Sequence, residues 1–166
     1  MKLSENLSLA EMVKSWTAIR KGIDNTPTPE HIENMKALAE NIFQPIRDYF
    51  GVPIHISSGY RSEKLNKAIG GAHKWIDGKY VATSQHCKGQ AIDIDRDGHH
   101  QPTNADVFNF IRDYLEFDQL IWEFGDTNNP DWVHVSYNPE GPQRKKILKA
   151  YKTPKGRTKY SIFHTI

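Results

Sequence analysis

The chain has 166 residues and a formal net charge of +2 at pH 7, and its composition is 37% hydrophobic, 25% charged and 11% aromatic. This length is typical of one compact domain of about 150 residues, and the composition excludes wholesale disorder. A single cysteine, Cys87, excludes an intrachain disulfide and a Cys-rich zinc finger. A metal site in this chain must therefore use histidine and carboxylate ligands.

Neither a membrane span nor a secretion signal is predicted. The longest apolar runs contain a few residues, far fewer than the ~20 that a membrane helix needs. The start MKLSENLSLAEMVKS lacks the apolar stretch of about 7–15 residues found in signal peptides. We therefore expect cytoplasmic synthesis.

Positive charge is concentrated at the C-terminal end. Residues 143–166 carry eight Lys or Arg and no Asp or Glu, which leaves 14 basic against 20 acidic residues, a charge of −6, in the rest of the chain. We expect a single domain over residues 1–151 and a basic tail over residues 152–166. Such a tail can contact nucleic acid, anionic cell-wall polymers or anionic lipid, and the alternative is a solvated tail without a partner.

Two helices are predicted in the N-terminal third. Ser8 fits an N-cap, and apolar residues at helical spacing predict a first helix over residues 8–19. Pro29 fits the first position of a second helix, which ends before Gly51. Its apolar stripe is formed by Ile32, Met35, Leu38, Ile42, Phe43, Ile46 and Tyr49.

Strands dominate the remainder of the chain. They are expected over residues 54–58, 90–95, 119–124, 132–137 and 145–151. Helices are expected over residues 63–68 and 104–115, the second capped by Asn104, and the polar stretch 70–84 reads as a long loop. Helices grouped before strands predict an α+β fold in which an antiparallel sheet has helices packed on one face.

Half of a metal site is suggested around His86. Of the eight histidines, His99 and His100 are expected to face solvent, whereas His86 lies in a turn seven residues before Asp93 in a strand. Ile92 would face the core, so Asp93 would project from the other face. Asp95 shares that face and is the alternative ligand.

The second half is suggested by Asp131 and His134. Residues three apart in a strand point to opposite faces, so these two side chains converge only if Asp131 lies in the turn before the strand. Two histidines and one carboxylate would leave a fourth tetrahedral position for water, as in catalytic zinc sites.

Three motifs together resemble a known family: Ser57-Ser-Gly-Tyr60-Arg61, His86-x-x-Gly89-x-Ala91-x-Asp93 and Asp131-x-x-His134. This arrangement is similar to the M15 family of zinc D-Ala-D-Ala peptidases, and in particular to the subgroup common among bacteriophage endolysins and bacterial wall enzymes. The motifs span residues 54–137, and the helical segment 7–50 also resembles the subgroup. The resemblance implies a hedgehog/DD-peptidase-like fold.

The resemblance also implies roles for single residues. His86, Asp93 and His134 would bind Zn²⁺, and Asp131 would be the general base for the zinc-bound water. Arg61 would polarise the scissile carbonyl and stabilise the oxyanion. Glu123 is the alternative base.

Further residues near the motifs are expected to contact substrate: Tyr60, His73, Trp75, Ser84 and Gln85. Ser84 and Gln85 can instead orient the first ligand. Cys87 adjoins that ligand and could bind zinc, but a small buried side chain is the expected role.

These observations predict a zinc-dependent peptidase of the peptidoglycan stem peptide, of a phage or prophage endolysin type. It would act on the cell wall after release, as a monomer, and would either remove terminal D-Ala or cleave the L-Ala-D-Glu bond or a cross-link. The basic tail would attract anionic wall polymers, whereas no nucleic-acid motif is present. The alternative is a non-catalytic zinc-containing module that binds the cell wall or belongs to a phage tail.

Overall fold

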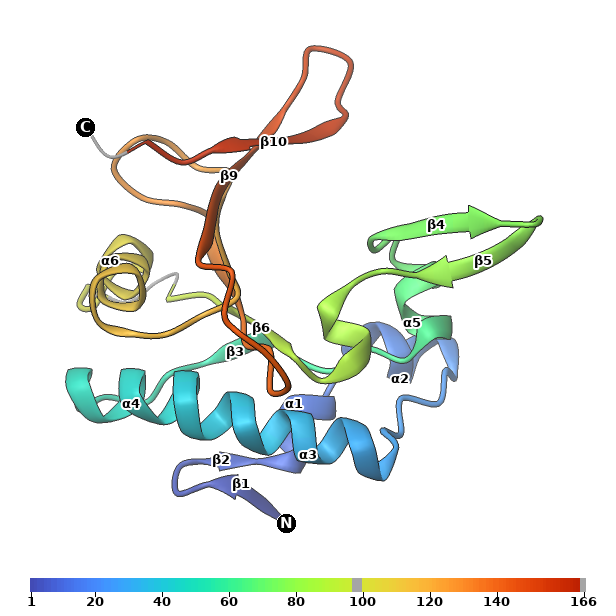
Figure 1. Cartoon of the computed structure of the whole chain (residues 1–166), viewed down its shortest axis with the longest axis horizontal. Helices are drawn as coiled ribbons and strands as arrows, with labels where there is room; N and C mark the ends of the chain where they lie inside the picture. The colour runs from blue at the N-terminus through green and yellow to red at the C-terminus, as the bar shows by residue number, and fades with distance from the viewer. Residues whose placement is uncertain (97–99, 165–166) are drawn as a thin grey trace.

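The computed structural model describes residues 1–96 and 100–164 (Figure 1). His99 lies outside the described residues, and His100 is exposed as expected. The elements in chain order are β1 (Lys2–Ser4), β2 (Leu7–Ser8), α1 (Leu9–Val13), α2 (Trp16–Lys21), α3 (Pro29–Leu38), the π-helix η1 (Ala39–Phe43), α4 (Gln44–Phe50), β3 (Ile56–Ser58), α5 (Glu63–Ala68), β4 (His73–Ile76), β5 (Lys79–Ala82), the 3₁₀ helix η2 (Gln85–Lys88), β6 (Ala91–Ile94), α6 (Asn104–Tyr114), β7 (Gln119–Glu123), β8 (Trp132–Ser136), β9 (Lys146–Lys152) and β10 (Thr158–Ile162). None of the helices in this described part has the length and apolar character needed to cross a membrane.

Two short helices replace the one expected over residues 8–19. Ser8 caps α1 in a capping box, because its hydroxyl accepts the Glu11 backbone N–H while its own N–H donates to the Glu11 carboxylate at 2.9 Å. Ser15 then caps α2 separately. The break leaves Trp16 62% exposed, outside the core.

The second expected helix runs through α3, η1 and α4 without interruption. It begins at Pro29 and ends at Gly51, which has a left-handed conformation (φ 66°). Pro45 lacks an N–H and its ring crowds the preceding turn, which accounts for the wider π-helical turn before it. Tyr49, expected in the buried stripe, is 62% exposed. The fully or nearly fully buried members of the stripe are Met35, Leu38, Ile42, Phe43 and Ile46.

The main sheet has six strands among the described residues, in the order β10-β9-β7-β8-β6-β3. Its neighbouring strands are antiparallel except β7 and β9, which are parallel. The expectation of an antiparallel sheet is therefore wrong for this pair. After β8 the chain crosses to the free edge of β7 and runs in the same direction as β7, instead of returning through a tight hairpin.

Alternation along the strands gives the sheet two different faces. One face joins the helices in a single core, through Ile92, Ile94, Leu120, Trp122, Val133 and Val135. This confirms the α+β arrangement with helices over one face. The opposite face carries Asp93, Glu123 and His134.

Two hairpins form where irregular segments were expected. The predicted loop 70–84 contains β4 and β5, joined by Asp77 (φ 50°) and Gly78 (φ 73°). An Asp-Gly pair with both φ positive is a preferred two-residue hairpin turn. β10 was not predicted, and it pairs antiparallel with β9, so much of the segment expected as a basic tail lies in the main sheet.

The helix α6 is capped by Thr103 and not by Asn104. The Thr103 hydroxyl accepts the Asp106 N–H. Asn104 is buried and links two segments instead, because its carboxamide accepts the Arg96 N–H at 2.6 Å and donates to the Asp131 carbonyl at 3.0 Å. This link ties the end of β6 to the start of β8.

Candidate metal centre

Three buried side chains meet on the face of the sheet opposite the helices. The distances are 3.2 Å between His86 Nε2 and His134 Nδ1, 3.0 Å between His134 Nδ1 and Asp93 Oδ1, and 3.3 Å between His86 Nε2 and Asp93 Oδ1. The exposed fractions are 2%, 7% and 9% for His86, Asp93 and His134. The three predicted ligands therefore lie together, and within the described chain they form a group of side chains that can hold a metal ion.

Strand register and one turn position these three residues. Asp93 and His134 are directly opposite each other in the antiparallel pair β6 and β8, so both side chains point to the same face. His86 lies in η2, which ends at Gly89 in a left-handed conformation (φ 71°). Its Nδ1 contacts the Gly59 carbonyl at 2.7 Å.

The electrostatics of the three residues suit a cation. Burial lowers the pKa of His86, and its Nδ1 contacts the Gly59 carbonyl, so Nε2 is the nitrogen that faces the centre. Burial opposes ionisation of Asp93, but His86 and His134 outweigh it and hold the pKa of Asp93 well below its usual range. The centre therefore contains an ionised carboxylate with imidazole nitrogens beside it.

Arg61 lies next to the candidate ligands. Its Nη2 donates to Asp93 Oδ2 at 3.3 Å and its Nε to Ser58 Oγ at 3.1 Å. The side chain is 14% exposed and lines the same groove as the three ligands. This placement fits the role that the resemblance implied for Arg61.

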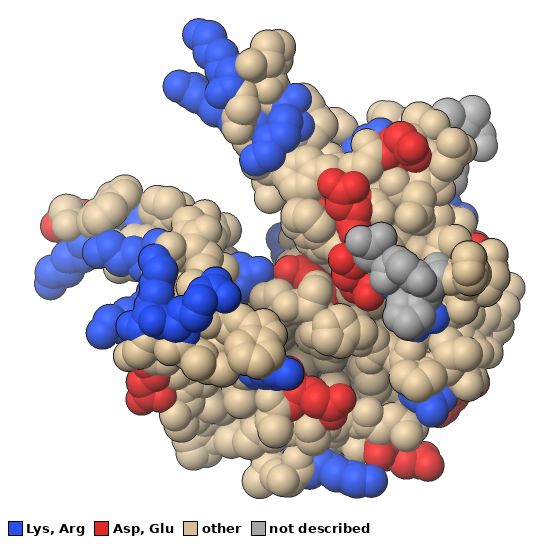
Figure 2. Space-filling model, turned by 180° about the vertical axis from the view of Figure 1, so that it is seen from behind, with Lys and Arg blue, Asp and Glu red and all other residues tan. Residues whose placement is uncertain are grey.

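The groove over the centre has a volume of about 650 Å³. The bases of two hairpins form its walls: the chain around β4 and β5 on one side and β9 with β10 on the other (Figure 1). Both hairpins project from the body, and Figure 2 shows Lys and Arg gathered on both projections. The groove residues outside the centre include Arg61, Gly71, Ser84, Gln85, Glu123, Arg144, Leu148, Lys152 and Tyr160.

Glu123, and not Asp131, lies in this groove. Asp131 lies in the bend immediately before β8, as the convergence argument required, and its N–H donates to the Glu123 carbonyl at 2.8 Å. The Asp131 side chain is nevertheless exposed, and Asp131 is not among the residues that line the groove. Glu123 is paired with Trp132, which shares a face with His134. The structure therefore does not bring Asp131 to the centre.

The environment of Glu123 suits a general base. The residue is 7% exposed, and burial raises its pKa to about 7; the Asp93 charge also raises it, while His134 and Arg61 oppose the shift. A base with a pKa near the operating pH combines the correct protonation state with the strongest drive for proton transfer.

The other alternative ligands lie outside the centre. Asp95 accepts a hydrogen bond from Asn104 Nδ2 at 3.1 Å and does not belong to the ligand group. Cys87 is buried, and burial raises the pKa of its thiol to about 11. It therefore remains a protonated thiol, as expected for a small buried side chain.

Two of the five expected substrate contacts line the groove. Ser84 accepts the His86 backbone N–H at 3.3 Å, and Gln85 Nε2 donates to Asp118 Oδ2 at 3.0 Å. Ser84 therefore helps to position the first ligand. Gln85 belongs to a network at the end of the groove.

The other three expected contacts lie elsewhere. Tyr60 is 5% exposed and packs in the core, where its hydroxyl contacts His31 Nδ1 at 3.2 Å. His73 and Trp75 lie on β4, where both rings contact Tyr80. The hairpin explains the difference, because strand alternation directs these rings toward Tyr80, and the groove is lined by the base of the hairpin.

Sequence analysis missed the C-terminal wall of the groove. Arg144, Lys152 and Tyr160 line it, and the phenol pKa of Tyr160 is raised by partial desolvation and by the charges of Glu123 and Asp93. A strand was expected over residues 145–151, but β10 was not, because its five residues are all exposed and give only a weak signal. A polar run with many lysines is typical of a tail as well as of a half-exposed strand.

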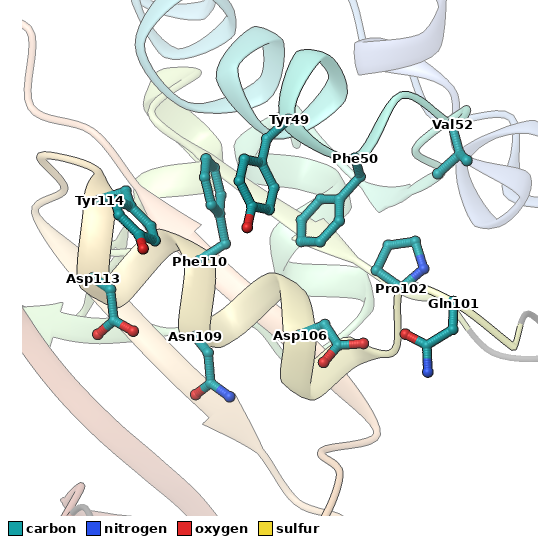
Figure 3. Close-up of a pocket in the computed structure, with 10 residues that line it drawn as sticks. All are labelled: Tyr49, Phe50, Val52, Gln101, Pro102, Asp106, Asn109, Phe110, Asp113 and Tyr114. Atoms are coloured by element: carbon teal, nitrogen blue, oxygen red, sulfur yellow. The ribbon is translucent and has the colours of Figure 1, made fainter.

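A second pocket lies between α4 and α6 (Figure 3). Tyr49 and Phe50 from α4 face Phe110 and Tyr114 from α6, and the Tyr49 and Phe110 rings stack with centroids 4.2 Å apart. α6 packs on the helix-covered face of the sheet. This pocket is therefore separate from the candidate metal centre.

Comparison with known proteins gives one family. A family model described as Peptidase M15 matches residues 5–136, a segment that contains all three candidate ligands, Arg61 and Glu123. No curated protein matches the chain.

Gly89→Ala is expected to destabilise the fold and weaken metal binding. A Cβ at this position would lie 2.5 Å from the His31 carbonyl oxygen and 2.9 Å from Met35 Cγ, at a φ of +71°. The left-handed strain and the overpacking together should cost about 2–4 kcal/mol of unfolding free energy. Gly22→Ala is the matched control, since its φ is +63° with no atom within 4 Å. Equal urea-unfolding losses for both variants would contradict the steric argument.

Glu123→Gln is expected to stabilise the metal-free protein at high pH only. The pKa of Glu123 is raised from 4.5 to about 7 in the fold, so ionisation costs stability once the pH rises above the unfolded-state value. The gain in unfolding free energy should be on the order of 3 kcal/mol at pH 8 and small at pH 4.5. Urea unfolding in a chelator measures it, with exposed Glu140→Gln as control. A gain independent of pH would show that desolvation of Glu123 is not the cause.

Proposed function

Because this chain belongs to the peptidase M15 family, and so to the peptidases, we propose that it is a zinc-dependent enzyme that hydrolyses the stem peptide of peptidoglycan. The observation that carries the zinc assignment is the convergence of His86 Nε2, Asp93 Oδ1 and His134 Nδ1 within 3.3 Å of one another.

The geometry and chemistry of these donors fit zinc. Zn²⁺ bonds of about 2.0–2.1 Å in a tetrahedral site place neighbouring ligand atoms roughly 3.3 Å apart. The three distances of 3.0, 3.2 and 3.3 Å are close to this value. Two imidazoles with one carboxylate also leave one coordination position for water or substrate, as catalytic zinc sites do.

The groove residues can perform the remaining steps of hydrolysis. Bound zinc would supply Lewis acidity, which lowers the pKa of water and polarises the peptide carbonyl. Glu123 would accept the proton of the attacking water and return it to the leaving amine. Arg61, held by Ser58 and Asp93, would donate to the oxyanion as charge develops on it.

The cell-wall substrate and the phage-type role rest on the resemblance of the sequence motifs. An endolysin-type enzyme would reach the wall after release through a membrane lesion. Contact with anionic wall polymers is part of the same proposal. It is supported by Lys155 and Arg157, which are exposed in the turn between β9 and β10.

The general base can be identified by a pair of variants. Glu123→Gln is expected to lower kcat by about 10²–10⁴-fold with zinc retained, since it removes only the proton acceptor. Asp131→Asn should leave kcat close to the wild-type value, because the Asp131 side chain is outside the groove. Turnover and zinc content are measured on the same preparations. Loss of turnover in Asp131→Asn alone would return the base to Asp131.

An experiment with and without metal tests whether the protein is a metallopeptidase, and its products show which peptide bond is cleaved. Purified peptidoglycan is incubated with the zinc-loaded protein, with and without a chelator, and the products are analysed by mass spectrometry. We expect cleavage that the chelator abolishes and added zinc restores, and His134→Ala should lose zinc and activity together. The new termini distinguish loss of D-Ala from scission at L-Ala-D-Glu. A folded, zinc-loaded protein that yields no products from several wall types would favour a binding module.

A further inference from the structure

Besides Arg61, a second guanidinium lines the groove, that of Arg144. Arg144 is held by Asp118, whose carboxylate accepts Nε at 3.1 Å and Nη2 at 2.7 Å. The Asp118 side chain is 4% exposed, whereas that of Arg144 is 56% exposed. A buried carboxylate therefore fixes a guanidinium that faces the groove.

The fixed guanidinium retains donors for a ligand. A guanidinium has five N–H groups, and the bonds to Asp118 use its Nε and Nη2. Among the described residues, no hydrogen bond to Arg144 Nη1 is present. Asp118 also raises the pKa of Arg144, so the group stays charged. The free edge is therefore a permanent cationic donor that is already ordered before a ligand arrives.

The same carboxylate connects Arg144 to the metal centre. Asp118 Oδ2 also accepts from Gln85 Nε2 at 3.0 Å, and Gln85 directly precedes the ligand His86. Gln85 and Arg144 both line the groove. Arg144 itself lies just before β9, outside the strands β6 and β8 that carry Asp93 and His134.

We propose that Arg144, positioned by Asp118, is a subsite for a carboxylate of the peptide substrate, with Gln85 beside it. This inference rests on the proposed peptidase function and adds a preference for acidic peptides. A guanidinium held in a fixed plane binds carboxylates bidentately and selects them over neutral amides.

The test uses matched stem-peptide substrates that carry either free carboxylates or their amides. The wild-type enzyme is expected to prefer the free acid. Arg144→Gln should lower kcat/KM for the acid by about 10- to 100-fold through KM, with a much smaller effect on the amide. Arg112→Gln, which breaks an Arg–Asp pair on α6, is the matched control and should leave kcat/KM unchanged for both substrates.

Two further variants separate recognition from stability. The double variant Asp118→Asn with Arg144→Gln removes the unpaired buried charge and should show the same loss of acid preference. Arg144→Lys keeps a charge but loses the planar fork, and should retain part of the preference. Equal losses on acid and amide, or an unchanged acid preference in Arg144→Gln, would overturn the proposal.

Binding measurements keep the two proposals distinguishable. Titration calorimetry of both peptides with wild-type protein and Arg144→Gln measures acid preference without turnover. If the wild-type protein cleaves neither peptide but binds the acid in an Arg144-dependent way, the peptidase proposal fails and the carboxylate subsite stands. If the wild-type protein cleaves both peptides without any acid preference in binding or in kcat/KM, the peptidase proposal stands and the carboxylate subsite is overturned.

Discussion

The candidate centre depends on the register between β6 and β8. Asp93 and His134 share a face because they are directly opposite in this antiparallel pair. A slip of one residue would direct His134 into the core. The opposite face prevents such a slip, because Ile92 and Val135 are fully buried there. Hydrophobic burial on one side of the sheet therefore holds the polar ligands together on the other.

Two carboxylates on this polar face have pKa values shifted in opposite directions. His86 and His134 keep the pKa of Asp93 low despite its burial, which suits a ligand. Burial raises the pKa of Glu123 to about 7, because the opposing charges of His134 and Arg61 do not outweigh the effect of burial there. Environments that separate two carboxylates in this way typically separate their chemical roles. The pair therefore supports Asp93 as ligand and Glu123 as base.

Local patterns predicted much of the fold and the ligand set. Strand alternation and a glycine turn, both encoded within a few residues, made His86, Asp93 and His134 candidates, and the resemblance to the family selected Asp93 over Asp95. The bend that the pattern required before β8 is present at Asp131, but Glu123 and not Asp131 lines the groove. Short-range patterns carry no information on which of these two carboxylates reaches the groove, because that depends on how β7 and β8 pair.

Larger errors came from tertiary context. Trp75 was placed near substrate because residues 70–84 were read as a loop, although Asp77-Gly78 is a hairpin signal. β10 was missed because its stability comes from pairing with β9, and its own side chains are exposed. Such a strand has no hydrophobic alternation of its own to detect.

The residues proposed to carry out the reaction all lie inside the segment that matches the family. Residues 5–136 contain the candidate ligands, Arg61 and Glu123. The opposite wall of the groove comes from the chain beyond residue 136, through Arg144, Lys152 and Tyr160. Because that wall contacts whatever lies over the centre, its sequence can change the preferred peptide without changing the ligands or the base.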